Sequence, residues 1–230
     1  MTARVPISES WDTIRKDRDG YFLELPESET ASINAVDSGD RRCESTAEIT
    51  AELYGEISCA GVSGLFASDI LQPILARSGF VFVDLGSGTG KMVTQVAIDH
   101  TQCRQAVGVE LSATRHSAGV AALAEGVGRG WITASQRARI SLLHQNALDA
   151  DAREANIVYL ANYAFSDDLS QRIADSVLSV EAAPQLEIVL CLRELKSPEH
   201  CSLVLAAKLT AHMSWTRCQE VFAYVRRTKH

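Results

Sequence analysis

The sequence predicts an α/β fold, in which a seven-stranded sheet is covered by helices on both faces and preceded by a small helical lead-in. Three observations carry this prediction. Short apolar runs rich in β-branched residues alternate with helical periods, an order typical of parallel sheets. A glycine-rich stretch, FVFVDLGSGTGK at residues 80–91, includes the first such run. The last two apolar runs have no strong helix between them, which predicts a final antiparallel hairpin.

The N-terminal part of the chain divides into two regions. Residues 1–45 are polar and of mixed charge, without a sustained period, and we expect a flexible or loosely ordered arm. A single domain is expected over residues 46–230. Its first helices should lie within residues 46–78, where Ser45 offers a cap and Pro73 interrupts a helical pattern.

The strands and the main helices follow in order along the domain. The expected strands are Phe80–Asp84, Ala106–Glu110, Ile140–His144, Ile157–Ala161, Leu186–Leu192, Leu203–Leu209 and Val221–Val225. The expected helices are Met92–His100, Ala113–Glu125 and Asp167–Val180. Ser166 can cap the last of these helices. Seven strands ending in a hairpin are the arrangement of the class I methyltransferase (Rossmann-like) fold rather than of a six-stranded dehydrogenase sheet.

Composition narrows the possible surroundings and partners. The 230 residues, 46% of them hydrophobic, suffice for one substantial core. A net charge of -7 attracts no nucleic acid, so such a partner would need a local basic patch. The six cysteines stand singly without C-x-x-C spacing, which argues against a zinc cluster and favours a reducing compartment. No signal peptide or membrane span is recognisable, so we expect no membrane partner and a location in the nucleus or cytosol.

The glycine stretch can be tested against known phosphate-binding loops. A nucleoside triphosphate loop needs G-x-x-x-x-G-K-[ST], but Leu85 stands at the first glycine position and Met92 follows the lysine. A dinucleotide loop needs G-x-G-x-x-G, whereas the third glycine here comes one residue early. Asp84, directly before the loop, would also repel a pyrophosphate. The pattern therefore disfavours a nicotinamide-dependent dehydrogenase.

Asp84 suits a ligand that carries an ammonium and a sulfonium, because a carboxylate stabilises nearby positive charge. S-adenosylmethionine is such a ligand, and the loop glycines let the backbone approach its methionyl part closely. Glu110 ends the next strand, where a carboxylate can accept both ribose hydroxyls. An ordinary tight turn followed by a solvated glutamate is the alternative.

The segment VYLANYAF places polar and aromatic side chains at the end of the fourth expected strand. Asn162, Tyr163 and Phe165 have the spacing of the N-P-P-[YF] element of methyltransferases that act on amines. Amide and backbone oxygens can hold the N–H groups of an attacking amine, and an aromatic ring can wall a cationic pocket. The alternative is that the two aromatic residues belong to the core and Asn162 caps a turn.

Five segments together resemble a known family in order and spacing. They are LYGEIS (53–58), VFVDLGSGTG (81–90), GVE (108–110), ANYAF (161–165) and MSWT (213–216). The resemblance covers roughly residues 46–228, and the family is the catalytic domain of the disruptor-of-telomeric-silencing type. These histone-lysine N-methyltransferases lack a SET domain and act on a lysine of the nucleosome core.

The resemblance implies a site for S-adenosylmethionine, with S-adenosylhomocysteine as product and no metal. The implied cofactor-binding residues are Tyr54 and Glu56 in a loop over the cofactor, Asp84, Gly86 and Gly88 at its methionyl part, Glu110 at the ribose and Asn146 at the adenine. The implied lysine channel is lined by Asn162, Tyr163, Phe165 and Trp215. The implied partner is a nucleosome or histone, and the implied location is the nucleus.

Three positions depart from the family pattern. Ala161 stands where the family usually has a first asparagine, Ile57 where it has threonine, and Lys91 where glutamine is common. The basic tract with which family members bind nucleosomes is also not obvious. Two alternatives therefore remain: a methyltransferase of this fold that acts on a non-histone protein or a small-molecule amine, and a non-catalytic, cofactor-binding chromatin module.

Overall fold

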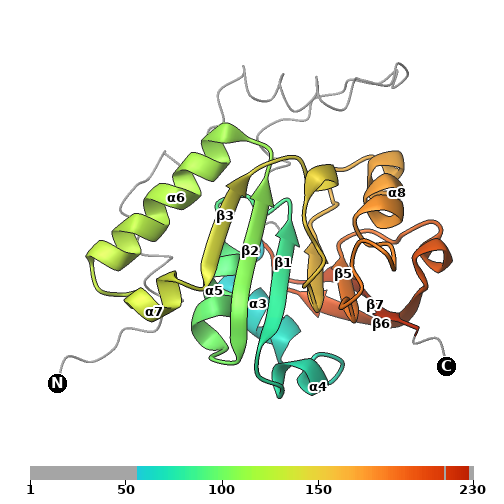
Figure 1. The fold of residues 1–230 in the computed structure, drawn as a ribbon, viewed down its shortest axis with the longest axis horizontal. Helices are drawn as coiled ribbons and strands as arrows, with labels where there is room; N and C mark the ends of the chain where they lie inside the picture. The colour runs from blue at the N-terminus through green and yellow to red at the C-terminus, as the bar shows by residue number, and fades with distance from the viewer. Residues whose placement is uncertain (1–55, 215, 228–230) are drawn as a thin grey trace.

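The computed structural model describes residues 56–214 and 216–227, and their central feature is one seven-stranded sheet (Figure 1). The strand order is β3-β2-β1-β4-β5-β7-β6, with β7 antiparallel to both of its neighbours. The strands are β1 (Phe80–Leu85), β2 (Cys103–Glu110), β3 (Ile140–His144), β4 (Ile157–Leu160), β5 (Ile188–Cys191), β6 (Leu203–Ala211) and β7 (Gln219–Arg226). The expected α/β class, seven strands and terminal hairpin are confirmed.

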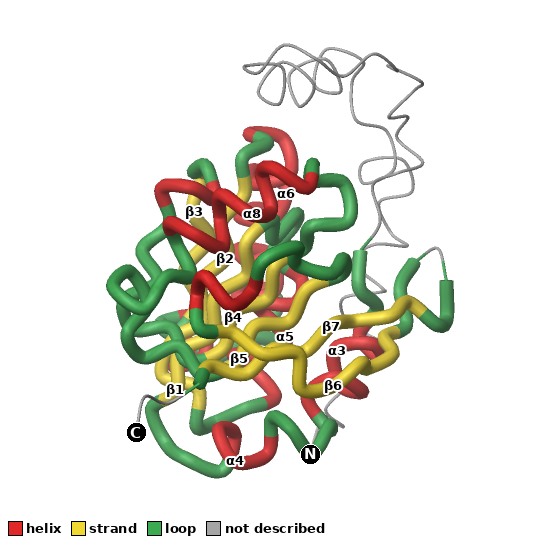
Figure 2. The backbone as a smooth tube through the Cα atoms, turned by 90° about the vertical axis from the view of Figure 1, so that its right-hand side faces the viewer, coloured by secondary structure: helices red, strands yellow, loops and turns green. Residues whose placement is uncertain are grey.

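Helices cover both faces of the sheet, as Figures 1 and 2 show from two directions. The longer helices are α3 (Cys59–Phe66), α5 (Lys91–Asp99), α6 (Ala113–Gly128) and α8 (Asp167–Ser176). The short ones are α4 (Gln72–Leu75) and α7 (Ala134–Arg137), with 3-10 turns η2 (Ala147–Asp149) and η3 (Pro198–Cys201). Strands enclosed in this way must be apolar on both sides, and all residues of β1, β4 and β5 are buried.

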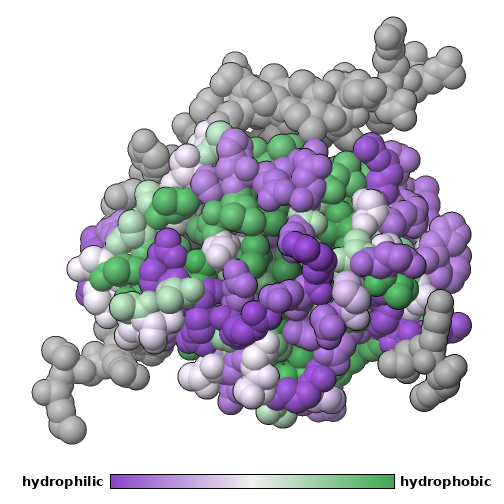
Figure 3. Space-filling model, viewed as in Figure 1, coloured by the Kyte–Doolittle hydropathy of each residue, from purple (hydrophilic) through white to green (hydrophobic). Residues whose placement is uncertain are grey.

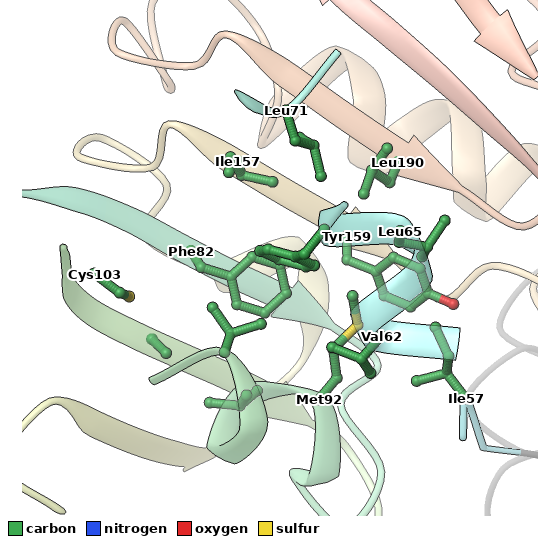
Figure 4. Close-up of a cluster of buried hydrophobic side chains, with 14 of the residues drawn as sticks. Ile57, Val62, Leu65, Leu71, Phe82, Met92, Cys103, Ile157, Tyr159 and Leu190 are labelled. Atoms are coloured by element: carbon green, nitrogen blue, oxygen red, sulfur yellow. The ribbon is translucent and has the colours of Figure 1, made fainter. Parts of the chain in front are cut away.

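Alternate residues of the central strands enter two separate cores. Phe80 and Phe82 of β1 pack with α3, α4 and α5, whereas Val81 and Val83 pack with α8. Full burial of each such side chain stabilises the folded state by about 1.5–3 kcal/mol. The same alternation turns Asp84 toward the α3 and α5 side, and its pairing partner on β4 is Tyr159. Figure 4 shows part of this core around Tyr159.

The lead-in differs in detail from its prediction. α3 ends at Phe66, and Pro73 stands in the first turn of α4 rather than ending a helix. Proline suits a first turn because the N–H it lacks would have no helical partner there. The expected helix near Ser45 and the arm of residues 1–45 lie outside the described residues. Helix α8 ends four residues before the predicted Val180, because the N–H of Leu178 bonds the carbonyl of Ile173 and closes the last turn.

Hydrophilic and hydrophobic residues are interspersed on the face drawn in Figure 3, with hydrophobic areas over the α6 and β3 side. Leu111, Val120, Val127 and Leu143 are exposed large hydrophobic residues of this region. Within the described residues, no helix is long and apolar enough to span a membrane.

Candidate functional site

The glycine loop at the end of β1 has a backbone that only glycine adopts readily. Gly86, Gly88 and Gly90 have φ of 89°, 55° and 74°, all in the left-handed region. A Cβ on Gly86 would lie 3.2 Å from the ring of Phe165, so this glycine also permits close approach of that aromatic residue. The loop ends at Gly90, which precedes the first residue of α5. It therefore presents backbone at the carboxyl edge of the sheet, where open α/β sheets bind ligands.

The carboxyl group of Asp84 is buried beneath this loop. Its side chain is 2% exposed, and Oδ1 has no hydrogen-bond partner among the described residues. Burial raises the pKa of Asp84 well above its usual value, and the nearby charge of Glu110 raises it further. An unpaired buried carboxylate is costly, so the site favours a ligand that brings positive charge to this position.

Glu110 links the glycine loop to the start of α6. Its Oε2 accepts the N–H of Gly88 at 2.8 Å, and Oε1 accepts the N–H of Ser112 at 2.8 Å. Arg115 donates to the same Oε1 from Nη2 at 2.7 Å and from Nε at 3.1 Å. Oε1 is thus fully engaged, whereas Oε2 retains a lone pair that a ligand hydroxyl can use.

Two segments far apart in the sequence meet above the glycine loop. Ile57 and Met213 form an isolated antiparallel bridge, and Ser214 donates its backbone N–H to the carbonyl of Glu56 at 2.8 Å. The carboxylate of Glu56 then accepts a hydrogen bond from the hydroxyl of Thr89 at 2.6 Å. The motifs around residues 56 and 214 therefore form one structural unit that touches the glycine loop. Tyr54, predicted for the loop over the cofactor, and Trp215, predicted for the lysine channel, lie outside the described residues.

Asn146 lies just after β3, at the edge of the sheet beside Glu110. Its Oδ1 accepts the N–H of Leu148 at 2.9 Å and caps the short helix η2. Glu110 pairs with His144 across the β2–β3 boundary, which brings Asn146 near the ribose-binding candidate. Leu111, next to Glu110, and Leu143 are each 40% exposed. Sequence reasoning assigned no role to either leucine, although a large apolar residue directly after the strand-ending acid was a visible signal.

The segment 161–165 separates its side chains into different environments. Asn162 is fully buried, and its Oδ1 accepts the N–H of Arg193 at 2.9 Å while its Nδ2 donates to the Arg193 carbonyl at 3.2 Å. These two hydrogen bonds join the segment that follows β4 to the segment that follows β5. Tyr163 is 41% exposed, and Phe165 lies half-buried over Gly86. Phe165 is therefore the member of this segment that lies against the glycine loop.

Arg193 is a residue that the sequence reading missed. Its guanidinium donates to the carbonyl of Phe165 at 2.6 Å and pairs with Asp167, while its backbone bonds Asn162. These contacts hold the segment 161–165 from the side of β5. An arginine directly after the buried run IVLCL is the signal that could have identified it.

The family model described as histone methylation protein DOT1 matches residues 35–201, more than half of the chain. The chain belongs to this family. The resemblance inferred from its motifs is thereby confirmed. Among curated proteins, none matches the sequence of this DOT1-family chain.

Solved structures of low sequence identity share the fold. Magnesium protoporphyrin IX methyltransferase from Synechocystis PCC 6803, solved with bound S-adenosylmethionine, has 9% identity and a TM-score of 0.54, covering 72% of this chain and 78% of that chain. The methyltransferase domain of bacterial CtHen1 has 12% identity and a TM-score of 0.51, covering 71% of this chain and 96% of that one. The DOT1-family chain thus has a class I methyltransferase fold, and family and fold together support methyltransferase activity.

In residues 56–214 and 216–227, no three histidine, cysteine, aspartate or glutamate side chains gather in a way that could hold a metal ion.

Proposed function

We propose that this protein is an S-adenosylmethionine-dependent lysine N-methyltransferase that acts on a core histone lysine of the nucleosome, in the nucleus. The single observation that carries the cofactor assignment is the buried Oδ1 of Asp84, which has no partner among the described residues and lies below a loop of left-handed glycines. Membership of the DOT1 family supports the histone as acceptor.

The residues present fit this cofactor. Asp84 offers negative charge where the ammonium of the methionyl part would lie. Gly86 and Gly88 have no side chain and therefore leave room for the main-chain atoms of the methionyl part. Glu110 offers the remaining lone pair of Oε2 to one ribose hydroxyl. The exposed side chain of Leu111 offers an apolar surface to the adenine. When bound, S-adenosylmethionine supplies an electrophilic methyl group on a sulfonium.

Transfer to an amine requires a defined line of approach and the exclusion of water. Phe165 lies over Gly86 and can wall one side of the path. Asn162 and Arg193 hold the backbone of the segment 161–165 and so keep Phe165 in place. In this arrangement Asn162 acts as a positioning residue, because its amide already bonds the backbone of Arg193.

A second acceptor class is favoured by one observation. Ala161 has no amide, and the amide of Asn162 bonds Arg193, so these two positions turn no side-chain amide toward an acceptor. The same fold would then serve a non-histone protein or a small-molecule amine.

The test compares the wild-type protein with Glu110→Ala by titration calorimetry with S-adenosylmethionine, followed by labelled methyl transfer. Recombinant nucleosomes, free histones and a cell extract serve as acceptors. We expect micromolar binding that weakens at least tenfold in the variant, and label on nucleosomal histone with the wild type alone. Label only on other acceptors would support the second class. Tight binding without any turnover would favour a non-catalytic module, and no binding would refute the cofactor assignment.

A further inference from the structure

Tyr159 is a buried phenol in the central strand β4 to which the proposed function assigns no role. Its side chain is 3% exposed, and it pairs in register with Asp84 on β1, so both side chains point to the same face of the sheet. Figure 4 shows the ring among Val62, Leu65 and Met92, with its hydroxyl directed toward the Ile57 side.

The hydroxyl of Tyr159 has no hydrogen-bond partner among the described residues. Phenylalanine would fill nearly the same volume of this core, so packing alone does not require the hydroxyl. Its pairing neighbour Asp84 has a buried polar atom, Oδ1, without a partner among the described residues. A hydroxyl without a described partner, placed in register beside this buried carboxyl oxygen, indicates a site that a ligand completes.

The side chains of Tyr159 and Asp84 also interact electrostatically. Burial raises the pKa of Tyr159 well above its usual value, and the carboxylate of Asp84 raises it further. The phenol is therefore protonated at neutral pH and has both a donor hydrogen and an acceptor oxygen.

The direction of the Tyr159 hydroxyl is a further observation. Ile57 follows Glu56, which bonds Thr89 of the glycine loop, so the hydroxyl is turned toward the segment that touches this loop.

We propose that Tyr159 is a further cofactor-positioning residue, which together with Asp84 receives the ammonium of the methionyl part of the methyl donor. This inference rests on the proposed function. The carboxylate supplies the opposite charge, and the phenol oxygen accepts one N–H of the ammonium, which has three to donate. The carboxylate and the phenol thereby each gain a hydrogen-bond partner.

The test is calorimetric binding of three compounds to the wild type and to Tyr159→Phe. S-adenosylmethionine and S-adenosylhomocysteine both carry the ammonium, whereas methylthioadenosine lacks the whole amino-acid part. We expect Tyr159→Phe to weaken the first two by roughly tenfold, as loss of a hydrogen bond to a charged group does, and to leave methylthioadenosine unchanged. The melting temperature of the variant without ligand should stay close to that of the wild type, because the hydroxyl bonds none of the described residues.

The matched control is Tyr224→Phe. The hydroxyl of Tyr224 is also buried, but it accepts the N–H of Leu195 at 3.0 Å on the other face of the sheet. Its loss should lower the melting temperature and leave all three affinities unchanged. Equal affinities of wild type and Tyr159→Phe, or an equal loss for methylthioadenosine, would overturn the inference alone. A wild type that binds none of the three compounds would overturn the proposed function and the inference with it.

Discussion

The side-chain amide of Asn162 forms hydrogen bonds with both the N–H and the carbonyl of Arg193, which joins the ends of β4 and β5. The two residues are 31 positions apart, and Asn162 is fully buried. In an open α/β sheet the ligand-binding segments follow the strands, so this pair determines how the segment 161–165 is held.

Asn162→Ala should therefore act mainly on stability. The change leaves the N–H and carbonyl of Arg193 without their partner, which should lower the free energy of unfolding by roughly 2–3 kcal/mol. Denaturant unfolding measures this loss. If Asn162 instead contacted the acceptor directly, turnover would fall while stability stayed near that of the wild type.

Thr89→Val tests the contact between the glycine loop and Glu56. The variant removes the hydroxyl that donates to Glu56 at 2.6 Å, and a hydrogen bond to a charged group contributes about 1.5–3 kcal/mol when buried. Because Glu56 is only half-buried, we expect a smaller loss of about 1 kcal/mol, together with severalfold weaker cofactor binding.

Thr94→Val is the matched control for that change. The hydroxyl of Thr94 on α5 is buried and has no partner among the described residues. Its removal should leave the free energy of unfolding unchanged or increase it. Thermal melts of both variants, with and without S-adenosylmethionine, make the comparison, and equal losses in the two variants would contradict the role given to Thr89.

Asp84→Asn should remove a pH dependence of stability. The pKa of Asp84 is raised in the folded chain by burial and by Glu110, so the folded state holds this proton more tightly than the unfolded state. The resulting stabilisation is complete below the usual aspartate pKa and is lost as the pH rises through the raised folded value.

Melting temperatures measured from pH 4 upward test this sign. The wild type should lose stability over the window in which Asp84 ionises, whereas Asp84→Asn, which stays neutral, should show a flatter profile there. The same variant should bind S-adenosylmethionine much more weakly, because the ammonium loses its counter-charge. Parallel pH profiles for the two proteins would refute the buried-carboxyl interpretation.

Gly86→Ala should disturb the loop for two reasons. The residue has a φ of 89°, and a Cβ would lie 3.2 Å from Phe165 and 3.4 Å from Ala161. We expect a loss of roughly 1–3 kcal/mol and weaker cofactor binding. In contrast, Gly64→Ala on α3 meets nothing within 4 Å and should increase the free energy of unfolding by about 0.4–1 kcal/mol. Denaturant unfolding of both variants measures these changes in the free energy of unfolding. An unchanged free energy of unfolding in Gly86→Ala would show that the loop tolerates a side chain.

The order of the elements could be predicted from the sequence because hydrophobic period and glycine placement are local signals. All seven strands lie at their expected positions, and the final hairpin is present. The exact ends of helices and strands were harder to predict from the sequence. The beginning of α4 at Pro73 and the early end of α8 depend on which backbone groups find partners, and this is decided by neighbouring segments.

The candidate site was predictable in its residue types but not in their contacts. The sequence by itself determined the acidic residues Asp84 and Glu110 near two strand ends and the glycine loop between them, because strand ends and turns are encoded by nearby residues. Only the tertiary structure decided that Asn162 bonds Arg193, that Glu56 touches Thr89, and that Tyr159 lies beside Asp84. These contacts join strands and loops that are distant in the chain, and sheet register and packing, which no local pattern encodes, bring them together.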